Sequence, residues 1–420
     1  MGRPLLKVSC RPGAPLSCLH DGSCRRRQDA CILAAILASS VARGLLSRIR
    51  LPPGKMMFEI SIGALLVILV LFDVFQGIIV PRMASKTFRL APFLLGKIYW
   101  PAYSKLAKIP FIERSGSEFL DIFAPMCFVS LMGVWLSLLI LGYALILFGM
   151  RAEITPPIGN FGEAFYFAGT SVLTLGFGDI AAHGAVSRCV VLAAAVTGLV
   201  FMALQVSLLF TLQSMSQARE QVVNTIISRA GAPASGIVLL LRYKELKIVP
   251  SLSASFLAWE SWIAGILESH RSYPMLLYFR STNKSDSWMS VLGAMLDAAT
   301  LLLTSIEEVA IGEAELFYWL SCSTVKTMCR YLGLNAVDGA HLTRSEFDDG
   351  LSLLRDAGYK TVEEDHAWKL FRMRRSGYAG YLAALAQFLC APESAWIHEL
   401  AIYQLSEKQA VSDSIFQPRV

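Results

Sequence analysis

The sequence predicts an all-α membrane protein with three transmembrane helices, one re-entrant loop and a mainly helical C-terminal domain. Two properties of the 420 residues indicate this fold class: 55% are hydrophobic and only 17% are charged. A chain of that composition is too apolar for an ordinary soluble protein. The apolar excess lies before about residue 217, whereas the remainder has charges at a normal globular frequency. We therefore expect the main domain boundary near residue 218.

Three segments have the roughly 20 mostly apolar residues that a helix needs to cross a bilayer core of about 30 Å. They are residues 60–80, 119–148 and 189–212. Pro81 and Arg82 end the first, because proline cannot continue a helix and arginine marks the membrane interface. No segment carries Lys or Arg at every third position, so a voltage-sensing helix is not expected.

Residues 161–179, between the second and third spans, are apolar and rich in aromatic and small side chains. The stretch is too short to cross the bilayer, which is typical of a loop that enters and leaves on one side. Non-helical backbone at membrane depth is tolerated only where protein buries it or where it lines a water-filled cavity. The stretch therefore predicts a pore.

The end of this loop, from Phe165 to Asp179, is FYFAGTSVLTLGFGD. It resembles the pore loop of the potassium-channel superfamily, with threonine, an aliphatic residue, glycine, an aromatic residue, glycine and aspartate in order. The resemblance covers about residues 119–215 and implies a two-helix pore unit of the prokaryotic type, preceded here by one additional helix. It also implies a homotetramer, because one pore loop per chain requires four chains around one axis.

The resemblance implies that a permeant potassium ion, with no other cofactor, is coordinated at Thr174, Leu175, Gly176 and Phe177. Their backbone oxygens, with the Thr174 hydroxyl, would replace the water shell of the ion. Successive carbonyls can face one axis only if alternate residues adopt conformations open to glycine, which assigns Gly176 and Gly178. Leu175 and Phe177 would then point away from the axis.

Three further positions are candidates for function around this filter. Asp179 at the outer mouth would concentrate cations. Phe177 replaces the commonest tyrosine and lacks its supporting hydroxyl, which leaves the strictness of potassium selectivity open. Gly198, 20 residues beyond Gly178, is either a gating hinge or a site of close helix packing, since glycine weakens a helix by roughly 1 kcal/mol.

Polar residues inside the spans are costly and should face protein or water. Asp73 is either a regulatory proton site or the partner of a group such as Gln76. If it is a proton site, Asp73→Asn will shift the pH dependence of activity, and an unaltered pH profile would remove that hypothesis. Gln205 and Ser207 either face an aqueous cavity or hydrogen-bond across helices.

Basic residues predict the orientation. The seven Lys and Arg between residues 82 and 114 place that side in the cytoplasm, and with it the C-terminal domain of a multi-pass plasma (cell inner) membrane protein. The first span must then enter from outside, which conflicts with ten Lys and Arg in the 55 residues before it. Residues 1–55 are either a signal-like segment or short helix, or an upstream extension before a start at Met56 or Met57, which we favour.

The predicted domains are residues 1–55, 56–118, 119–217 and 218–420. The last is expected to be a helical regulatory or assembly domain with an unidentified ligand. Its helical stretches are residues 256–268, 288–305, 314–332, 344–356 and 378–389. Asp297 and the short length of its segment favour a buried core helix over a fourth span. No G-x-G-x-x-G follows a strand pattern, so a nucleotide-binding domain is not supported.

Other classes of function find little support. His270, His341, His366 and His398 lack metal-ligand spacing, so we do not expect an enzyme. The nine cysteines lack paired spacing, which argues against zinc and a disulfide framework. Basic residues flank apolar segments, which indicates contacts with anionic membrane lipids and not with nucleic acid. Two alternatives remain: a weakly selective cation channel, and a non-conducting sensor with a relic pore.

Overall fold

The computed structural model describes residues 54–78, 90–106, 122–281, 286–307, 311–337, 342–392 and Trp396. Nearly all of the predicted N-terminal extension lies outside these residues, as do His341 and His398. The described chain is almost entirely helical, with three long apolar helices and a mainly helical C-terminal region. This confirms the predicted fold class.

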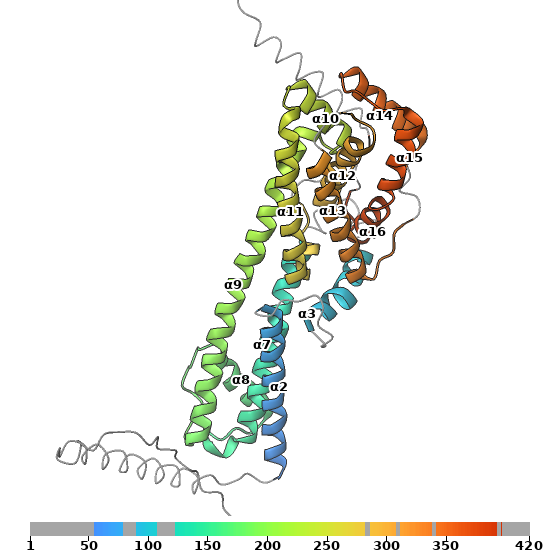
Figure 1. Ribbon diagram of the computed structural model, residues 1–420. Coiled ribbons are helices and arrows are strands. Elements are labelled where there is room, and N and C mark those ends of the chain that lie inside the picture. Colours follow the sequence, from blue (N-terminus) through green and yellow to red (C-terminus); the bar gives the residue numbers. More distant parts are fainter. Residues whose placement is uncertain are drawn as a thin grey trace, which may run out of the picture.

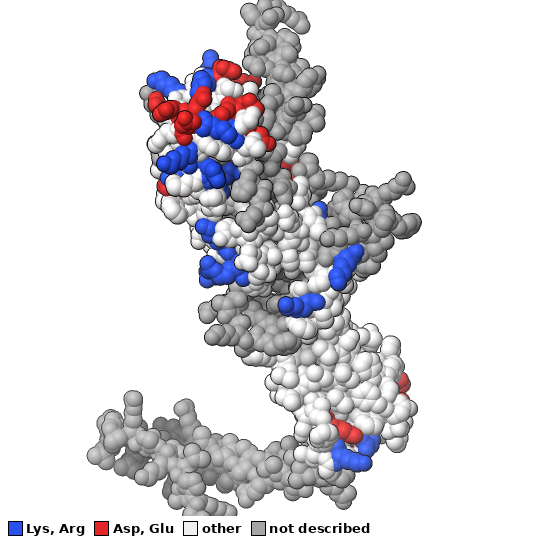
Figure 2. All heavy atoms as spheres, turned by 90° about the vertical axis from the view of Figure 1, so that its right-hand side faces the viewer, with Lys and Arg blue, Asp and Glu red and all other residues white. Residues whose placement is uncertain are grey.

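Three helices are long and apolar enough to cross a membrane: α2 (Gly54–Ile78), α7 (Phe123–Gly149) and α9 (Ala185–Ala230). They run side by side through the lower half of the molecule, with the short helix α8 (Phe161–Val172) among them (Figure 1). In Figure 2 charged side chains gather on the upper half, while the lower half shows a broad uncharged surface down to a small charged cluster at its tip. A broad surface without charged side chains is typical of the part of a membrane protein that contacts lipid.

Small residues bring α2 and α7 together. A Cβ on Gly63 would lie 2.5 Å from the Gly142 oxygen, and one on Gly149 would lie 2.6 Å from Ile60. Backbones that approach this closely are typical of helix packing in membranes, where van der Waals contact replaces the hydrophobic effect. On its other face α2 exposes large apolar side chains, among them Phe58, Leu65, Ile68 and Phe72.

A helical linker follows α2 and consists of α3 (Leu90–Phe93), the π-helical η1 (Leu94–Tyr99) and α4 (Trp100–Leu106). The buried Trp100 ring lies 5.0 Å from that of Phe123, 5.2 Å from that of Tyr278 and 5.9 Å from that of Phe388, between ring centroids. Aromatic clusters at such distances stabilise beyond their buried area. The linker thus joins the base of α7 to the C-terminal domain.

Helix α9 passes without a break from the pore unit into the C-terminal domain, so the boundary expected near residue 218 lies inside one helix. The described part of the domain then continues through nine further helical elements. Its elements are α10 (Gly236–Glu245), η3 (Val249–Ser251), α11 (Leu252–Ser272), η4 (Pro274–Tyr278), α12 (Trp288–Thr304), α13 (Ile311–Leu332), α14 (Arg344–Asp356), α15 (Glu364–Arg375) and α16 (Ala379–Leu389). The sequence patterns did not predict α10 or α15.

Helix α12 is the core helix of this domain, as predicted. All of its residues except Leu303 are buried, and it packs against α10, α13, α15 and α16. Asp297, only 1% exposed, accepts hydrogen bonds from the Arg375 guanidinium at 3.1 Å and from the Tyr378 hydroxyl. The carboxylate is tolerated in this apolar helix because Arg375 at the end of α15 and Tyr378 before α16 donate hydrogen bonds to it.

A buried arginine ties α9 to η4. Arg219 is 4% exposed and donates hydrogen bonds to the backbone oxygens of Leu276 at 3.3 Å and Phe279 at 2.7 Å. It also pairs with Glu220 at 3.0 Å. Because a buried guanidinium needs all its hydrogen bonds, this contact fixes the position of α9 against the C-terminal domain.

His270 on α11 is buried beside this arginine. Its Nδ1–H donates to the Ile266 oxygen at 2.8 Å, and Nε2 has no partner among the described residues. Burial, and secondarily repulsion from Arg219, lowers the pKa of His270 to about 3. The imidazole is therefore neutral in the folded protein at physiological pH.

His270 is expected to make the C-terminal domain less stable in mild acid. The unfolded chain takes up a proton below its ordinary pKa of 6.5, whereas the folded chain does so only near 3. The free energy of unfolding is therefore unaffected by His270 above about pH 6.5 and decreases as the pH falls further, by about 2 kcal/mol at pH 5. Thermal unfolding of the wild type and His270→Met at pH 7 and pH 5 measures this. Equal pH sensitivity of the two proteins would contradict it.

A candidate ion pore

The re-entrant loop begins with the predicted short helix. Helix α8 has 12 residues, too few to cross a bilayer. Asn160 caps it by accepting a hydrogen bond from the Glu163 N–H at 3.0 Å, and the Glu163 carboxylate accepts from the Gly159 N–H at 2.7 Å. This reciprocal cap fixes where the helix starts. The C-terminal end of α8, which carries partial negative charge, leads directly into the predicted filter.

The backbone after α8 alternates in the way that a carbonyl-lined filter requires. Thr174, Gly176 and Gly178 have positive φ angles of 57°, 56° and 80°. The N–H groups of Leu175 and Gly176 donate back to the Thr170 oxygen, at 2.8 and 3.3 Å. In the described part of the chain, no hydrogen bond ends on the backbone oxygens of residues 174–177. The two glycines have the conformation expected of them, and Thr174 shares it.

An aromatic layer lies behind the loop. The Phe177 ring stacks parallel to that of Tyr166, with 6.5 Å between centroids and 8° between planes. Of the aromatic residues of α8, Phe167 is buried within the chain, while Phe165 and Tyr166 are about 40% exposed. The ring of Tyr166 therefore supports the loop by packing against Phe177.

Polar contacts anchor the far end of the loop. After η2 (Arg151–Glu153), strand β1 (Ile154–Thr155) pairs antiparallel with β2 (Ala181–Ala182), directly beyond the filter. Arg188 of α9 donates to the Ala182 oxygen at 3.1 Å. A Cβ on Gly184 would lie 1.7 Å from the Glu153 carboxylate, so a larger residue there would displace that side chain. The loop is therefore fastened at both ends.

Gly198 packs against the base of the filter. A Cβ at this position would lie 1.7 Å from the Val172 oxygen, at the end of α8. Helix α9 continues through Gly198 without a break. The structure therefore contains the close packing that was one of two interpretations of this glycine, and the hinge stays a prediction.

Asp73 has two donors from its own chain. Its carboxylate accepts hydrogen bonds from the Trp135 indole at 2.8 Å and from the Leu90 N–H at 2.9 Å. These contacts join α2, α7 and the linker, which agrees with a structural role. The proton-site hypothesis stays a prediction.

Gln205 and Ser207 lie in different surroundings. Ser207 is exposed in the single chain. Gln205 is fully buried, and neither atom of its amide has a partner among the described residues. An amide buried without hydrogen bonds costs free energy, so the site is destabilising as it stands.

Gln205→Leu is expected to stabilise the protein by roughly 1–3 kcal/mol, because the buried amide is removed and a similar volume is kept. Thermal unfolding of the purified protein in detergent measures the change. Ser207→Ala, two residues along the same helix and exposed, is the matched control and should change stability little. A lower melting temperature for Gln205→Leu would contradict the expectation.

Metal-ligating clusters are not a feature of the described residues. No group of three or more His, Cys, Asp or Glu side chains there could hold a metal ion. The five described cysteines, Cys127, Cys189, Cys322, Cys329 and Cys390, are free. Any cation at the loop would therefore meet backbone oxygens and the Thr174 hydroxyl.

The helices and the loop define a membrane protein with an ion-channel pore unit. Residues 130–214 match the family model described as "Ion channel". The match includes every predicted filter residue and Gly198. It confirms the resemblance drawn from the loop at the level of an ion-channel pore unit.

Comparison with curated proteins gives a relative with no assigned function. The chain is 21% identical over 202 residues to the uncharacterized membrane protein YdjJ of Bacillus subtilis (strain 168). The alignment covers 47% of this chain and 58% of that protein, so the chain spans less than two thirds of the relative's length. No solved structure matches the chain.

Proposed function

We propose that the chain is the subunit of a homotetrameric, potassium-selective channel that mediates passive flux without a voltage sensor or any catalysed reaction. One observation carries this: along the alternating backbone of residues 174–178, four successive carbonyl oxygens have no hydrogen-bond partner among the described residues. Lipid offers no hydrogen bonds to backbone oxygens at membrane depth, so such groups need another partner. A dehydrated cation on a shared axis would satisfy them.

Exposed apolar side chains at the loop support the tetramer. In the single chain Leu175 is 55% exposed and Phe177 is 66% exposed. Large apolar groups beside a filter need cover, and neighbouring copies around the axis would supply it. The same copies would complete the ring of oxygens that one chain supplies only in part.

Potassium selectivity follows from rigid backbone oxygens at the filter. Tyr166 stacks parallel to Phe177 beside the filter. This packing favours strict selectivity over a weakly selective cation pore. Asp179, beyond the last glycine, would raise the local cation concentration at the outer mouth.

The proposed location is the cell's inner, plasma membrane, with the C-terminal domain in the cytoplasm. Both ends of the pore unit leave the spans on the side of the linker, which carries Lys97 and Lys105. Positive charges favour the cytoplasmic side of a membrane. The long α9 would transmit movements of the C-terminal domain, and of any ligand bound to it, to the filter.

Ion flux through the purified full-length protein in liposomes tests the proposal. Under bi-ionic conditions, with potassium on one side and sodium on the other, the reversal potential should report a strong preference for potassium. Equal permeability to potassium and sodium would show that the protein is the weakly selective cation channel. Complete absence of flux would favour the non-conducting sensor, and chemical cross-linking would decide separately whether four chains assemble.

A further inference from the structure

A cavity of about 410 Å³ lies where the membrane helices meet the C-terminal domain. Its walls come from α2, α7 and α9 on the membrane side, from η1 of the linker, and from η4, α13 and α16 of the C-terminal domain. Cavities of 300–1,000 Å³ hold ligands of drug size. The cavity is separate from the filter, which lies among α8 and the first half of α9.

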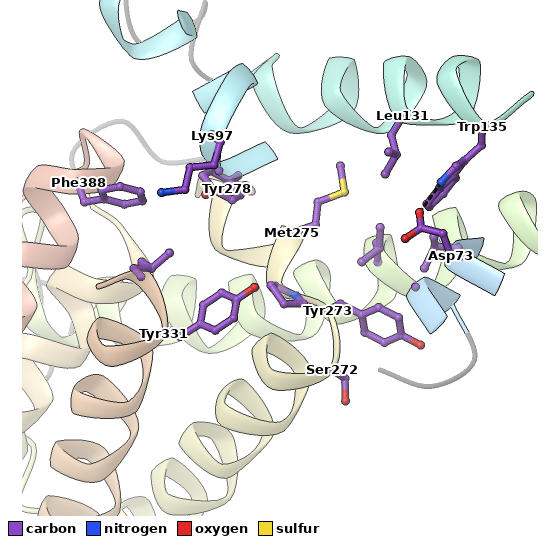
Figure 3. Close-up of a pocket in the computed structure, with 16 residues that line it drawn as sticks. Asp73, Lys97, Leu131, Trp135, Ser272, Tyr273, Met275, Tyr278, Tyr331 and Phe388 are labelled. Atoms are coloured by element: carbon purple, nitrogen blue, oxygen red, sulfur yellow. Dashed lines mark hydrogen bonds between the residues drawn. The ribbon is translucent and has the colours of Figure 1, made fainter. Parts of the chain in front are cut away.

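The two ends of the cavity differ in charge, with apolar side chains between them. Figure 3 shows Asp73 beside Trp135 at one end and Lys97 extending toward Phe388 at the other, with Met275 between. Asp73 already accepts two hydrogen bonds from the chain. No ion pair of Lys97 occurs among the described residues. The charge left for a ligand is positive.

We propose that this cavity binds an amphiphile with one hydrocarbon chain and an anionic head group, taken from the adjoining membrane leaflet. The ammonium of Lys97 would pair with the head group, and the chain would lie along Leu131, Leu208, Leu212 and Met275. A hydrocarbon chain gains free energy when it leaves water for such an apolar wall. Three of the walls are helices long and apolar enough to cross a membrane, so the cavity lies next to the lipid that would supply such a molecule.

The occupant would contact two elements that the chain already holds together. Leu208 and Leu212 belong to α9, and Met275 belongs to η4. Arg219, two turns beyond Leu212, joins α9 to η4 by its hydrogen bonds to Leu276 and Phe279. The site thus lies at the joint through which the C-terminal domain meets the pore helix.

Quenching of tryptophan fluorescence by bromine tests the proposal, because Trp135 lines the cavity. The full-length protein in zwitterionic lipid nanodiscs is titrated with dibrominated stearate, and in parallel with dibrominated stearyl alcohol. Gly96→Leu fills the cavity from η1, where a Cβ meets nothing within 4 Å. Gly133→Leu is its matched control, since a Cβ there is equally free and Gly133 does not line the cavity.

The charge is tested with Lys97→Gln, against Lys105→Gln on the same linker but outside the cavity. We expect saturable quenching by the stearate, lost in Gly96→Leu and retained in Gly133→Leu. Lys97→Gln should weaken binding about tenfold, as for a lost charge-assisted hydrogen bond, and Lys105→Gln should not. Quenching that does not saturate, or that persists in Gly96→Leu, would overturn the site. If the protein bound the alcohol as tightly as the stearate, or if Lys97→Gln bound the stearate as tightly as the wild type, the ligand would not need an anionic head group and that part of the proposal would be wrong.

Discussion

Gly176→Ala is expected to abolish ion flux while the helices remain folded. Gly176 has a φ of 56°, and a Cβ there would meet nothing within 4 Å of its own chain. The cost is therefore conformational, about 1–2 kcal/mol for an L-residue in the left-handed region. In the four copies of the proposed tetramer the cost reaches roughly 4–8 kcal/mol, enough to depopulate the conducting filter by roughly a thousandfold or more.

The measurement is potassium flux into liposomes, with circular dichroism to confirm the helical content. Gly169→Ala is the matched control, because Gly169 lies in α8 and a Cβ there would make an ordinary contact with Ile140 at 3.8 Å. Alanine is favoured over glycine inside a helix, so this variant should conduct. Undiminished flux through Gly176→Ala would contradict the assignment of the filter.

Asp297→Ala is expected to destabilise the C-terminal domain by about 3 kcal/mol, since it removes the buried carboxylate that pairs with the largely covered Arg375 guanidinium. Burial by itself lowers the pKa of Arg375, but the Asp297 carboxylate raises it above its ordinary value. The loss is a large part of the 5–15 kcal/mol that stabilises a typical domain. The melting temperature of the domain should fall by roughly 10 °C.

Two further variants separate the pair from its surroundings. Asp297→Ala with Arg375→Met removes both charges and should recover much of the lost stability, because an apolar pair often replaces a buried ion pair without cost. Glu364→Ala breaks the ion pair between Glu364 and Arg355. Because these two side chains are 49% and 48% exposed, the free energy of unfolding should fall by less than about 1 kcal/mol. A small effect of Asp297→Ala, equal to that of Glu364→Ala, would show that the buried pair contributes little.

The local conformation of the pore unit could be predicted from the sequence. Hydrophobic length gave the three spans, because a bilayer imposes a minimum on each helix. The start of α8 at Phe161 and the left-handed backbone at Gly176 and Gly178 follow from residue types that permit little else. The left-handed conformation of Thr174 was not predicted, because threonine rarely adopts it without surrounding structure that enforces it.

Contacts between residues distant in the sequence were decided only by the tertiary structure. Asp297 could be recognised as a core residue, but its partner Arg375 lies on a helix that no pattern indicated. The bond from Arg219 to η4, the unpaired amide of Gln205 and the cavity beside Lys97 arise where several helices converge. Periodicity reports which face of a helix is buried, whereas the identity of the group that packs there depends on the whole fold.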